Sequence, residues 1–280
     1  MASATPTTAP TDRLPAGLGA WLGGWLQALL GEVGRVTLVA VGYIGEFVSL
    51  NFRIVMHVIR GEVTRRELFD QMWLCGVRGL PIVLLTVGAV GLVVGVYMVP
   101  MFVMFGASGF IGGVTTKAML REAGPILGAT VIAARSGSAI AAEIGTMRVT
   151  EQLDALRALA TDPVEYLATP RYIALALMVP LLVLCGIIAG LLGAALIAGL
   201  EGVTIRQFVE SMGNLVKVDD LVTGLTKCVV FGELIAVASL HQGFRTGHGS
   251  EAVGRATTQS VVLCVLWIHL TNLALAFASN

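Results

Sequence analysis

Long apolar stretches alternate with short charged ones along most of this chain. Five of these stretches carry no charge or only one or two, and each reaches the length of about 20 residues that a helix needs to cross a bilayer. They are Gly79–Thr116, Ala123–Ala142, Tyr172–Leu200, Leu221–His241 and Ala256–Asn280. This pattern predicts an all-α, polytopic membrane protein in which residues 71–280 form a domain of five transmembrane helices.

The N-terminal quarter shows a weaker pattern. Residues 1–17 are rich in Thr, Ala and Pro and have no basic segment before an apolar core, so we expect a disordered tail and not a signal peptide. In residues 18–70, aromatic side chains typical of membrane interfaces are mixed with frequent charges. We expect an elbow of one or two helices lying along the membrane surface here. A sixth transmembrane helix near Val33–Val55 is the alternative.

Composition supports a membrane location and argues against several functions. Hydrophobic residues make up 56% and charged residues 13% of the chain, and the mean hydropathy is +0.84, whereas soluble domains carry about 25% charged residues. A net charge of zero argues against nucleic-acid binding. The four cysteines are scattered, so neither disulfides nor a zinc site are indicated. No phosphate-binding loop, HExxH or GxSxG motif occurs, so we expect no enzymatic activity, metal or cofactor in this chain.

The distribution of Lys and Arg predicts the orientation in the membrane. The region from Arg53 to Arg78, the central stretch and the loop with Arg245 are basic, whereas the connection after the first predicted helix has no basic residue. Basic loops lie on the cytoplasmic side. We therefore expect a cytoplasmic N-terminus and a periplasmic C-terminus.

A charged stretch, Glu143–Arg171, interrupts the apolar sequence near its middle. Apolar residues recur there at helical spacing, from Val149 to Ala160, and predict an amphipathic helix that ends near Thr161. Asp162 and the following proline predict the start of another helix. The amphipathic helix either rests on lipid headgroups or docks into a cytoplasmic partner. Its mixed charges favour a protein partner, because helices that bind membrane surfaces are mainly basic.

Charges inside predicted transmembrane helices cost about 2.5–3.5 kcal/mol each at the bilayer centre, so they need partners or a wet cavity. They are Arg121, Glu122, Arg135, Lys227 and Glu233. Arg121 and Glu122 point about 100° apart on a helix and cannot pair with each other. We expect their partners on other helices or in a second subunit. Either these charges hold helices together, or Arg121 and Glu122 line a lipid path and bind a headgroup.

Two kinds of apolar pattern accompany these charges. Leu92, Val96, Val99 and Phe102 fall along the first predicted helix and could line a cavity for acyl chains. The spacings Gly91–Gly95 and Gly186–Gly190 are typical of closely packed transmembrane helices, and we expect them to pack within one subunit.

The longest specific motif is LREAGPILGATVIAARSGSAIAAEIGTMRVTEQLDALRALATDPVEYLATPRYIA, residues 120–174. It resembles the MlaE/YrbE permease family, whose pattern combines RE-x-GP, AxRxGxxxAAEIGxMRxTEQxDAL, DP and PR. The segment GRATTQSVV, residues 254–262, also resembles that family, and the resemblance covers about residues 60–280. Two departures stand out: LATDP at residues 159–163 where relatives often have MGVDP, and Tyr97-Met98 where relatives tend to carry Gln-Gly.

The resemblance implies a homodimer in the bacterial inner membrane, with a cytoplasmic MlaF-type ATPase that uses ATP and Mg²⁺ and a periplasmic MlaD- or Mce-type ring protein. It implies that Glu143–Leu159 is a coupling helix seated in a groove of the ATPase. The candidate coupling residues are Glu143, Met147, Arg148, Glu151, Gln152, Asp154 and Leu156.

The function implied by the resemblance is that of a permease subunit of an ATP-binding-cassette transporter. It would move phospholipids or related lipids between the inner membrane and the periplasmic carrier, supporting outer-membrane lipid asymmetry. An alternative is a stand-alone secondary transporter for an apolar substrate, with the intramembrane charges as a proton relay, although no inverted repeat is apparent. A third possibility is a membrane scaffold without transport activity.

Overall fold

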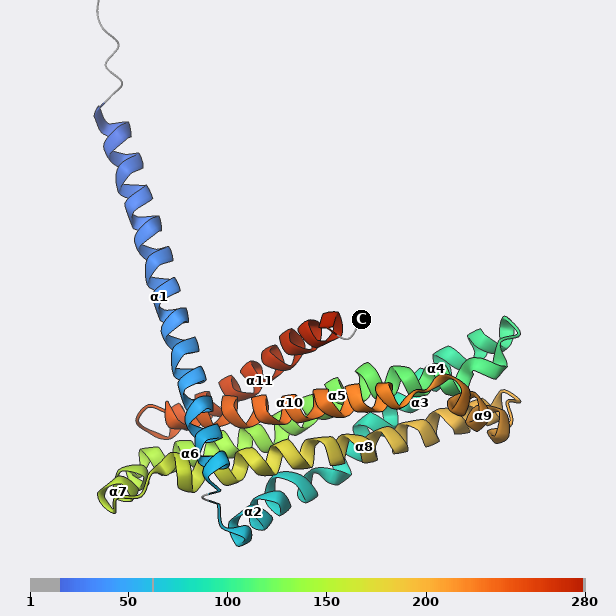
Figure 1. Ribbon diagram of the computed structural model, residues 1–280. Coiled ribbons are helices and arrows are strands. Elements are labelled where there is room, and N and C mark those ends of the chain that lie inside the picture. The colour runs from blue at the N-terminus through green and yellow to red at the C-terminus, as the bar shows by residue number, and fades with distance from the viewer. Residues whose placement is uncertain (1–15, 62, 279–280) are drawn as a thin grey trace, which may run out of the picture. The chain divides into compact units, whose positions relative to one another are not determined.

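The computed structural model describes residues 16–61 and 63–278, and these residues form helices without any strand (Figure 1). The α-helices are α1 (Ala16–Arg60), α2 (Arg65–Gln71), α3 (Leu80–Met104), α4 (Ile111–Ala118), α5 (Gly124–Ile132), α6 (Ser138–Val149), α7 (Gln152–Ala158), α8 (Thr169–Leu200), α9 (Ile205–Leu215), α10 (Val218–Phe244) and α11 (Ser250–Ala278). Four π-helical turns connect some of them: η1 (Met72–Gly76), η4 (Met119–Ala123), η5 (Ala133–Gly137) and η6 (Val164–Ala168). Two 3₁₀ turns are η2 (Val77–Gly79) and η3 (Ser108–Phe110).

The chain divides into two compact units, residues 1–48 and residues 49–280. In the first unit, the described residues belong to the N-terminal part of α1. The predicted disordered tail falls almost entirely on residues 1–15, which lie outside the described residues. The second unit contains the end of α1 and all later helices, and every site discussed below lies within it.

Six helical segments of the described chain are long and apolar enough to cross a membrane. They are Gly31–Arg60, Arg65–Met104, Ser108–Val149, Val164–Leu200, Val218–Phe244 and Ser250–Ala278. The last five overlap the five predicted transmembrane stretches, one for one, so the predicted class of all-α, polytopic membrane protein is confirmed. Gly31–Arg60 coincides with the alternative sixth span, and by length and composition alone it qualifies as one. That this segment forms a surface elbow stays a prediction.

The second span begins earlier than predicted. The chain reverses at Phe105–Ala107, in the uncharged connection expected after the first helix, and the rest of the charge-free stretch then belongs to the second span, which begins at Ser108 and not at Ala123. Gly106 adopts a φ of 67°, and the N–H of Ala107 donates to the C=O of Phe102 at 2.8 Å. Glycine accepts this left-handed conformation at low cost. The charged residues Arg121 and Glu122 therefore lie within the second span and do not mark its start.

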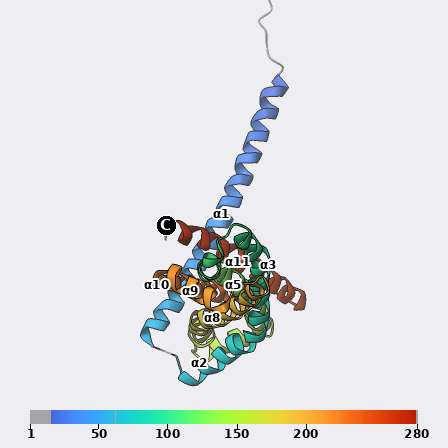
Figure 2. The ribbon, with the colours of Figure 1, turned by 90° about the vertical axis from the view of Figure 1, so that its right-hand side faces the viewer.

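Helix α8 forms the centre of the bundle and makes its most extensive contacts with α3 and α10, which flank it in the end-on view (Figure 2). The predicted small-residue packing within one chain is confirmed at the contact of α3 with α8. A Cβ atom added at Gly91 would overlap the backbone of Gly190, and one at Gly186 would lie 3.0 Å from the Cβ of Val87. The two backbones therefore touch, as small residues in transmembrane helices allow.

Candidate functional site

A cluster of charged side chains surrounds the π-helical turn η4. The Nζ of Lys227 lies 2.7 Å from a carboxylate oxygen of Glu122 and donates to the C=O of Arg121 at 2.9 Å. The amide nitrogen of Asn272 donates to the other carboxylate oxygen of Glu122 at 2.9 Å. Glu122 thus links the second span to α10 and α11. The expectation that its partner lies on another helix is confirmed.

Asp220 is the partner on the other side of η4. Its carboxylate is buried and lies 3.6 Å from the guanidinium of Arg121 and 3.7 Å from the ammonium of Lys117. It also accepts a hydrogen bond from the backbone N–H of Lys217 at 3.0 Å, which fixes it at the start of α10. Because Asp220 and Lys227 are two helical turns apart, they lie on the same face of α10. That face therefore engages both charges of the Arg121-Glu122 pair.

The local sequence explains why the helix adopts a π-helical turn at this point. Pro125 follows the turn and has no N–H that could donate to the C=O of Arg121 in an α-helical bond. Lys227 donates to that carbonyl oxygen instead. The π-helical turn, Met119–Ala123, widens the backbone at the two charged residues, and such turns are frequent at functional sites.

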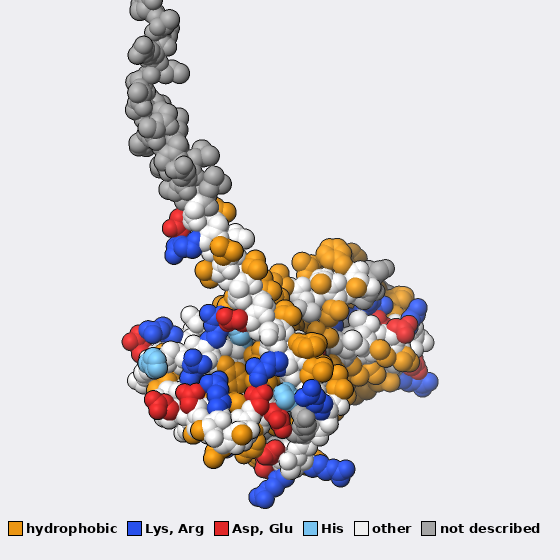
Figure 3. Space-filling model, turned by 60° about the vertical axis from the view of Figure 1, so that its left-hand side comes forward, with side chains coloured by type: hydrophobic (Ala, Val, Ile, Leu, Met, Phe, Trp, Pro, Cys, Tyr) orange, Lys and Arg blue, Asp and Glu red, His pale blue; other side chains and the backbone are white. Residues whose placement is uncertain are grey.

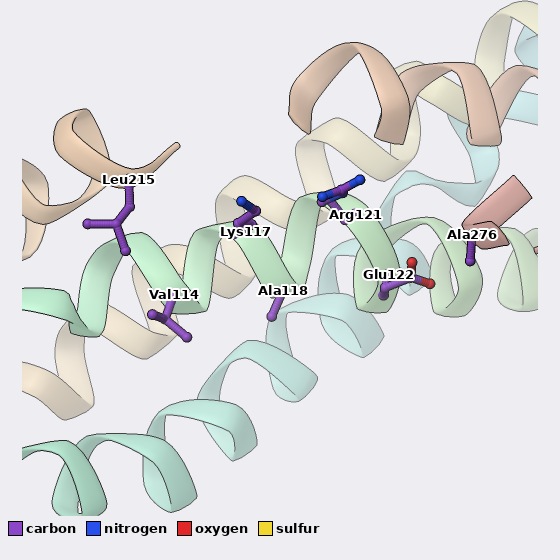
Figure 4. Close-up of a pocket in the computed structure, with 7 residues that line it drawn as sticks. All are labelled: Val114, Lys117, Ala118, Arg121, Glu122, Leu215 and Ala276. Carbon is purple, nitrogen blue, oxygen red and sulfur yellow. The ribbon is translucent and has the colours of Figure 1, made fainter. Parts of the chain in front are cut away.

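Beside this cluster lies a pocket of about 380 Å³ (Figure 4). Its lining residues are Val114, Lys117, Ala118, Arg121, Glu122, Leu215 and Ala276. Five of them come from the helix that contains η4, and the other two approach from α9 and α11 (Figure 4). The wall combines charged side chains with apolar ones. Such a surface suits an amphipathic ligand with a charged end.

The four apolar candidates for the lipid path do not share one surface in this chain. Leu92 and Val96 are exposed on α3. Val99 is fully buried in a cluster with residues of α4, α8 and α9, and Phe102 packs against the same cluster. None of the four lines the pocket beside Glu122.

The candidate coupling residues lie on two helices and not on one. The backbone turns at Thr150 and Glu151, where Glu151 has a φ of 59°. The prediction of one continuous helix over Glu143–Leu159 is therefore wrong. Glu143, Met147 and Arg148 belong to the end of α6, Glu151 lies in the turn, and Gln152, Asp154 and Leu156 belong to α7.

Contacts around α7 tie it to the end of the bundle. Leu153 is 2% exposed and anchors the helix, while Asp154 pairs with Arg157 at 2.7 Å within it. On α6, the guanidinium of Arg148 donates to the C=O of Phe244, and Glu143 lies 2.9 Å from the buried Arg171. Figure 3 shows charged side chains gathered at this end of the bundle, next to a largely hydrophobic flank.

The C-terminal end of α7 is closed by a left-handed residue. The N–H of Thr161 donates to the C=O of Leu156, and the N–H of Ala160 to the C=O of Arg157, both at 3.0 Å. This is a Schellman motif, in which the left-handed position is usually glycine. Here it is Ala160, with a φ of 57°, at the position where the LATDP sequence departs from MGVDP.

Asp162 begins the next helical segment, as predicted. One carboxylate oxygen accepts the N–H of Val164 at 3.0 Å, and the other accepts from Arg53 at 2.8 Å and lies 3.6 Å from His57. Burial raises the pKa of Asp162, but the Val164 hydrogen bond and the positive charge of Arg53 outweigh it. The net result is a pKa below the ordinary value of an aspartate.

Sequence reasoning did not select Lys117, Asp220 or Asn272 as site residues. The signal for Asp220 was its spacing of two helical turns from Lys227, which places both on one helix face. Asn272 had no comparable signal, because its contact depends on how α11 crosses α10. Glu233, another charge in a transmembrane helix, forms a hydrogen bond with Tyr172. Within the described part of the chain, no group of three or more His, Cys, Asp or Glu side chains could hold a metal ion.

Residues 68–278 match the family described as Permease MlaE. A probable ABC transporter permease protein of Synechocystis sp. is 40% identical over 229 residues, which cover 81% of this chain and 87% of that protein. One from Rickettsia felis is 36% identical over 248 residues, 88% of this chain and 96% of that protein. The chloroplastic protein TRIGALACTOSYLDIACYLGLYCEROL 1 of Arabidopsis thaliana is 36% identical over 225 residues, 80% of this chain and 64% of that protein. The chain therefore belongs to the MlaE permease family.

Proposed function

We propose that this permease moves phospholipids or related lipids between the inner membrane and a periplasmic carrier or ring protein, and so supports outer-membrane lipid asymmetry. The observation that carries this proposal is the charged cluster beside an apolar-walled pocket. Lys117, Arg121 and Lys227 supply three positive charges, against two carboxylates from Glu122 and Asp220. Cationic side chains bind phosphate through strong charge-assisted hydrogen bonds. The excess of positive charge would attract a lipid phosphate, and the apolar wall would contact its acyl chains.

A second copy of the chain would complete the lipid site. The pocket measures about 380 Å³, whereas pockets of about 300–1,000 Å³ hold drug-sized ligands, which are smaller than a diacyl lipid. A two-fold dimer would place two such pockets around a common cavity, because a symmetric interface presents the same surface twice. The name of the Arabidopsis relative contains a diacyl glycolipid, which agrees with a lipid substrate.

We infer that α7 docks into a cytoplasmic ATPase, which would use ATP and Mg²⁺ to drive lipid movement. Relatives named as ABC transporter permeases support a separate ATPase subunit. The helix is short, exposed on its polar face and anchored by Leu153. Residues with positive φ bound it at both ends, Glu151 between α6 and α7 and Ala160 after α7. A helix held in this way could transmit a displacement of the partner into the second and third spans.

A pair of charge reversals tests this function. Asp154 on α7 and Glu210 on α9 are both exposed carboxylates paired with an arginine of their own helix, and the two helices lie at opposite ends of the bundle (Figure 1). Either reversal breaks an exposed ion pair, which costs about 1 kcal/mol of stability. In vesicles containing the chain and its ATPase, Asp154→Lys should reduce ATP-dependent lipid transfer at least tenfold, while Glu210→Lys should leave it unchanged.

Two results would contradict the proposal. If Asp154→Lys binds the ATPase and transfers lipid like the wild type, α7 does not couple the two proteins. If the chain alone moves an apolar substrate when a proton gradient is applied, without ATPase or ATP, the secondary-transporter alternative is correct.

A further inference from the structure

A second polar pocket lies nearer to α7, between the span Arg65–Met104, called the first span here, and the second span, Ser108–Val149. It measures about 240 Å³, and its lining residues include Gln71, Leu74, Arg78, Arg135, Ser136 and Glu143. It shares no lining residue with the pocket beside Glu122.

Two π-helical turns form the walls of this pocket. Residues Met72–Gly76 of the first span face Ala133–Gly137 of the second. The hydroxyl of Ser136 donates to the C=O of Cys75 at 2.7 Å and joins the two turns. This arrangement repeats the one at η4, where a π-helical turn also presents charged side chains to a pocket.

The pocket gathers two arginines that lack a carboxylate. Arg135 reaches across to the first span, since a Cβ atom added at Gly79 would lie 3.5 Å from its guanidinium, next to Arg78. Within residues 16–61 and 63–278, neither arginine has an ion-pair partner. The acidic residue of the lining, Glu143, is engaged by Arg171 at 2.9 Å. Arg135 is half-buried and Arg78 is exposed. A half-buried guanidinium such as that of Arg135 is costly without a counter-charge, and Arg78 adds a second positive charge beside it, so this pocket favours an anion.

The depth of the pocket indicates which anion it meets. Both arginines lie about 40 Å along their helices from the turn at Phe105–Ala107, at a rise of 1.5 Å per residue. A bilayer with its headgroups is about 40–45 Å thick. If the turn lies at one headgroup layer, the arginines lie at the other, on the side of α7. Arg121 is only about 20 Å from the same turn.

We propose that Arg78 and Arg135 bind the phosphate of a membrane lipid in the leaflet on the α7 side, at a site separate from the cluster at Glu122. Guanidinium groups bind phosphate oxygens in bidentate fashion. Gln71 also lines the pocket and offers its amide as a further donor. The proposal rests on the proposed lipid-transport function. It adds a second binding site, which holds a headgroup before it enters, or after it leaves, the pocket beside Glu122.

Lipid binding to the purified full chain tests the site. The probe is a short-chain phosphatidylglycerol in uncharged detergent, with binding measured by native mass spectrometry. The double variant Arg78→Gln and Arg135→Gln should lose one bound lipid or bind it at least about tenfold more weakly, because glutamine carries no charge and cannot bind phosphate through a charged guanidinium fork. The control Arg66→Gln removes an exposed arginine of α2 on the same side and should bind like the wild type.

Two further ligands distinguish the source of the phosphate. A diacylglycerol with the same acyl chains should not occupy the site, because it lacks the phosphate. Inorganic phosphate at millimolar concentration should not displace the lipid. If phosphate alone binds with the affinity of the lipid, the site serves a free anion and the lipid proposal is wrong.

The remaining outcomes separate this site from the proposed function. If the double variant binds as many lipids as the wild type, with unchanged affinity, the inference is overturned while lipid transport stands. If the wild type neither binds the lipid nor transfers it with its ATPase, the proposed function itself fails. Arg78→Gln alone changes an exposed side chain, so it provides the same test should the double variant fold poorly.

Discussion

The charges around Glu122 and those around α7 are paired in different ways. Glu122 and Arg121 contact residues of α10 that are about 100 positions away in the sequence. In α7, Asp154 pairs with Arg157, one helical turn further on. In an apolar surrounding a charge must find a partner wherever the fold supplies one, because leaving it unpaired is costly. At a wet surface a local pair suffices, and the rest of the helix stays available for a partner protein.

The largest expected effect comes from breaking the pair between Glu122 and Lys227. Glu122→Ala leaves the ammonium of Lys227, whose side chain is 2% exposed, without its carboxylate. Removing one member of a fully buried ion pair costs about 3–5 kcal/mol, and because the Glu122 side chain is 47% exposed we expect the lower end of that range, about 3 kcal/mol. Glu210→Ala, which breaks an exposed pair on α9, should cost at most about 1 kcal/mol. Denaturant unfolding in detergent compares the two variants.

A second substitution sharpens this result. Lys227→Met added to Glu122→Ala removes the uncompensated charge and should restore part of the lost stability, since apolar replacements of buried pairs are often tolerated. Equal unfolding midpoints for Glu122→Ala and Glu210→Ala would show that the Glu122 cluster behaves like a surface pair.

A smaller effect of opposite sign is expected at the end of α7. Ala160→Gly places glycine at a φ of 57° and should stabilise the local structure by about 0.5–1 kcal/mol, the relief of left-handed strain less the entropy cost of glycine. The same substitution at Ala158, in the last helical position, should destabilise it by about 1 kcal/mol. Hydrogen exchange of the α7 amides measures both changes. Equal effects of the two substitutions would contradict a strained C-terminal end.

The smallest expected effect is the pH dependence of the contact between Arg53 and Asp162. Because the pKa of Asp162 is lowered in the folded chain, its stabilising contribution is present above the ordinary aspartate pKa of about 4 and is lost as the pH falls through the lower folded value. Asp162→Asn keeps an acceptor for Val164 but loses the charge. It should be less stable than the wild type by at most about 1 kcal/mol at pH 7.

This difference should shrink as the pH falls below about 4. Thermal unfolding of both chains at pH 7 and at pH 3.5 measures it, and Arg53→Gln should behave like Asp162→Asn. His57 also lies 3.6 Å from Asp162, so the variant His57→Gln measures how much His57 contributes to the pH dependence. A stability difference that stays constant with pH would show that the ion pair contributes nothing.

Much of the fold could be predicted because hydrophobicity is a local property of the sequence. The five apolar stretches, the glycine spacings and the start of a helix at Asp162 each depend on neighbouring residues, and the structure contains all three. The break at Thr150–Glu151 depends on a single backbone conformation. No periodic pattern signals it, so the sequence joined two helices into one. The second span begins at Ser108 and not at the predicted Ala123, because charged residues interrupt it.

The candidate site, like the fold, could be predicted only in part. That Arg121 and Glu122 need partners followed from the cost of burying charge, but Asp220, Lys227 and Asn272 are brought to them by the packing of α10 and α11. The second pocket was missed for a related reason. Arg78 and Arg135 lie far apart in the sequence and meet only because the first two spans run antiparallel and turn between them.

The contact between α3 and α8 has a mechanical consequence. With glycines on both helices, the two backbones interlock at Gly91 and Gly190, and no flexible side chain lies between them to absorb sliding or rotation. A transport cycle that changed the contact between α3 and α8 would have to separate their backbones. We therefore expect α3 and α8 to travel together as a single rigid body during any conformational change, with the hinge located elsewhere in the bundle.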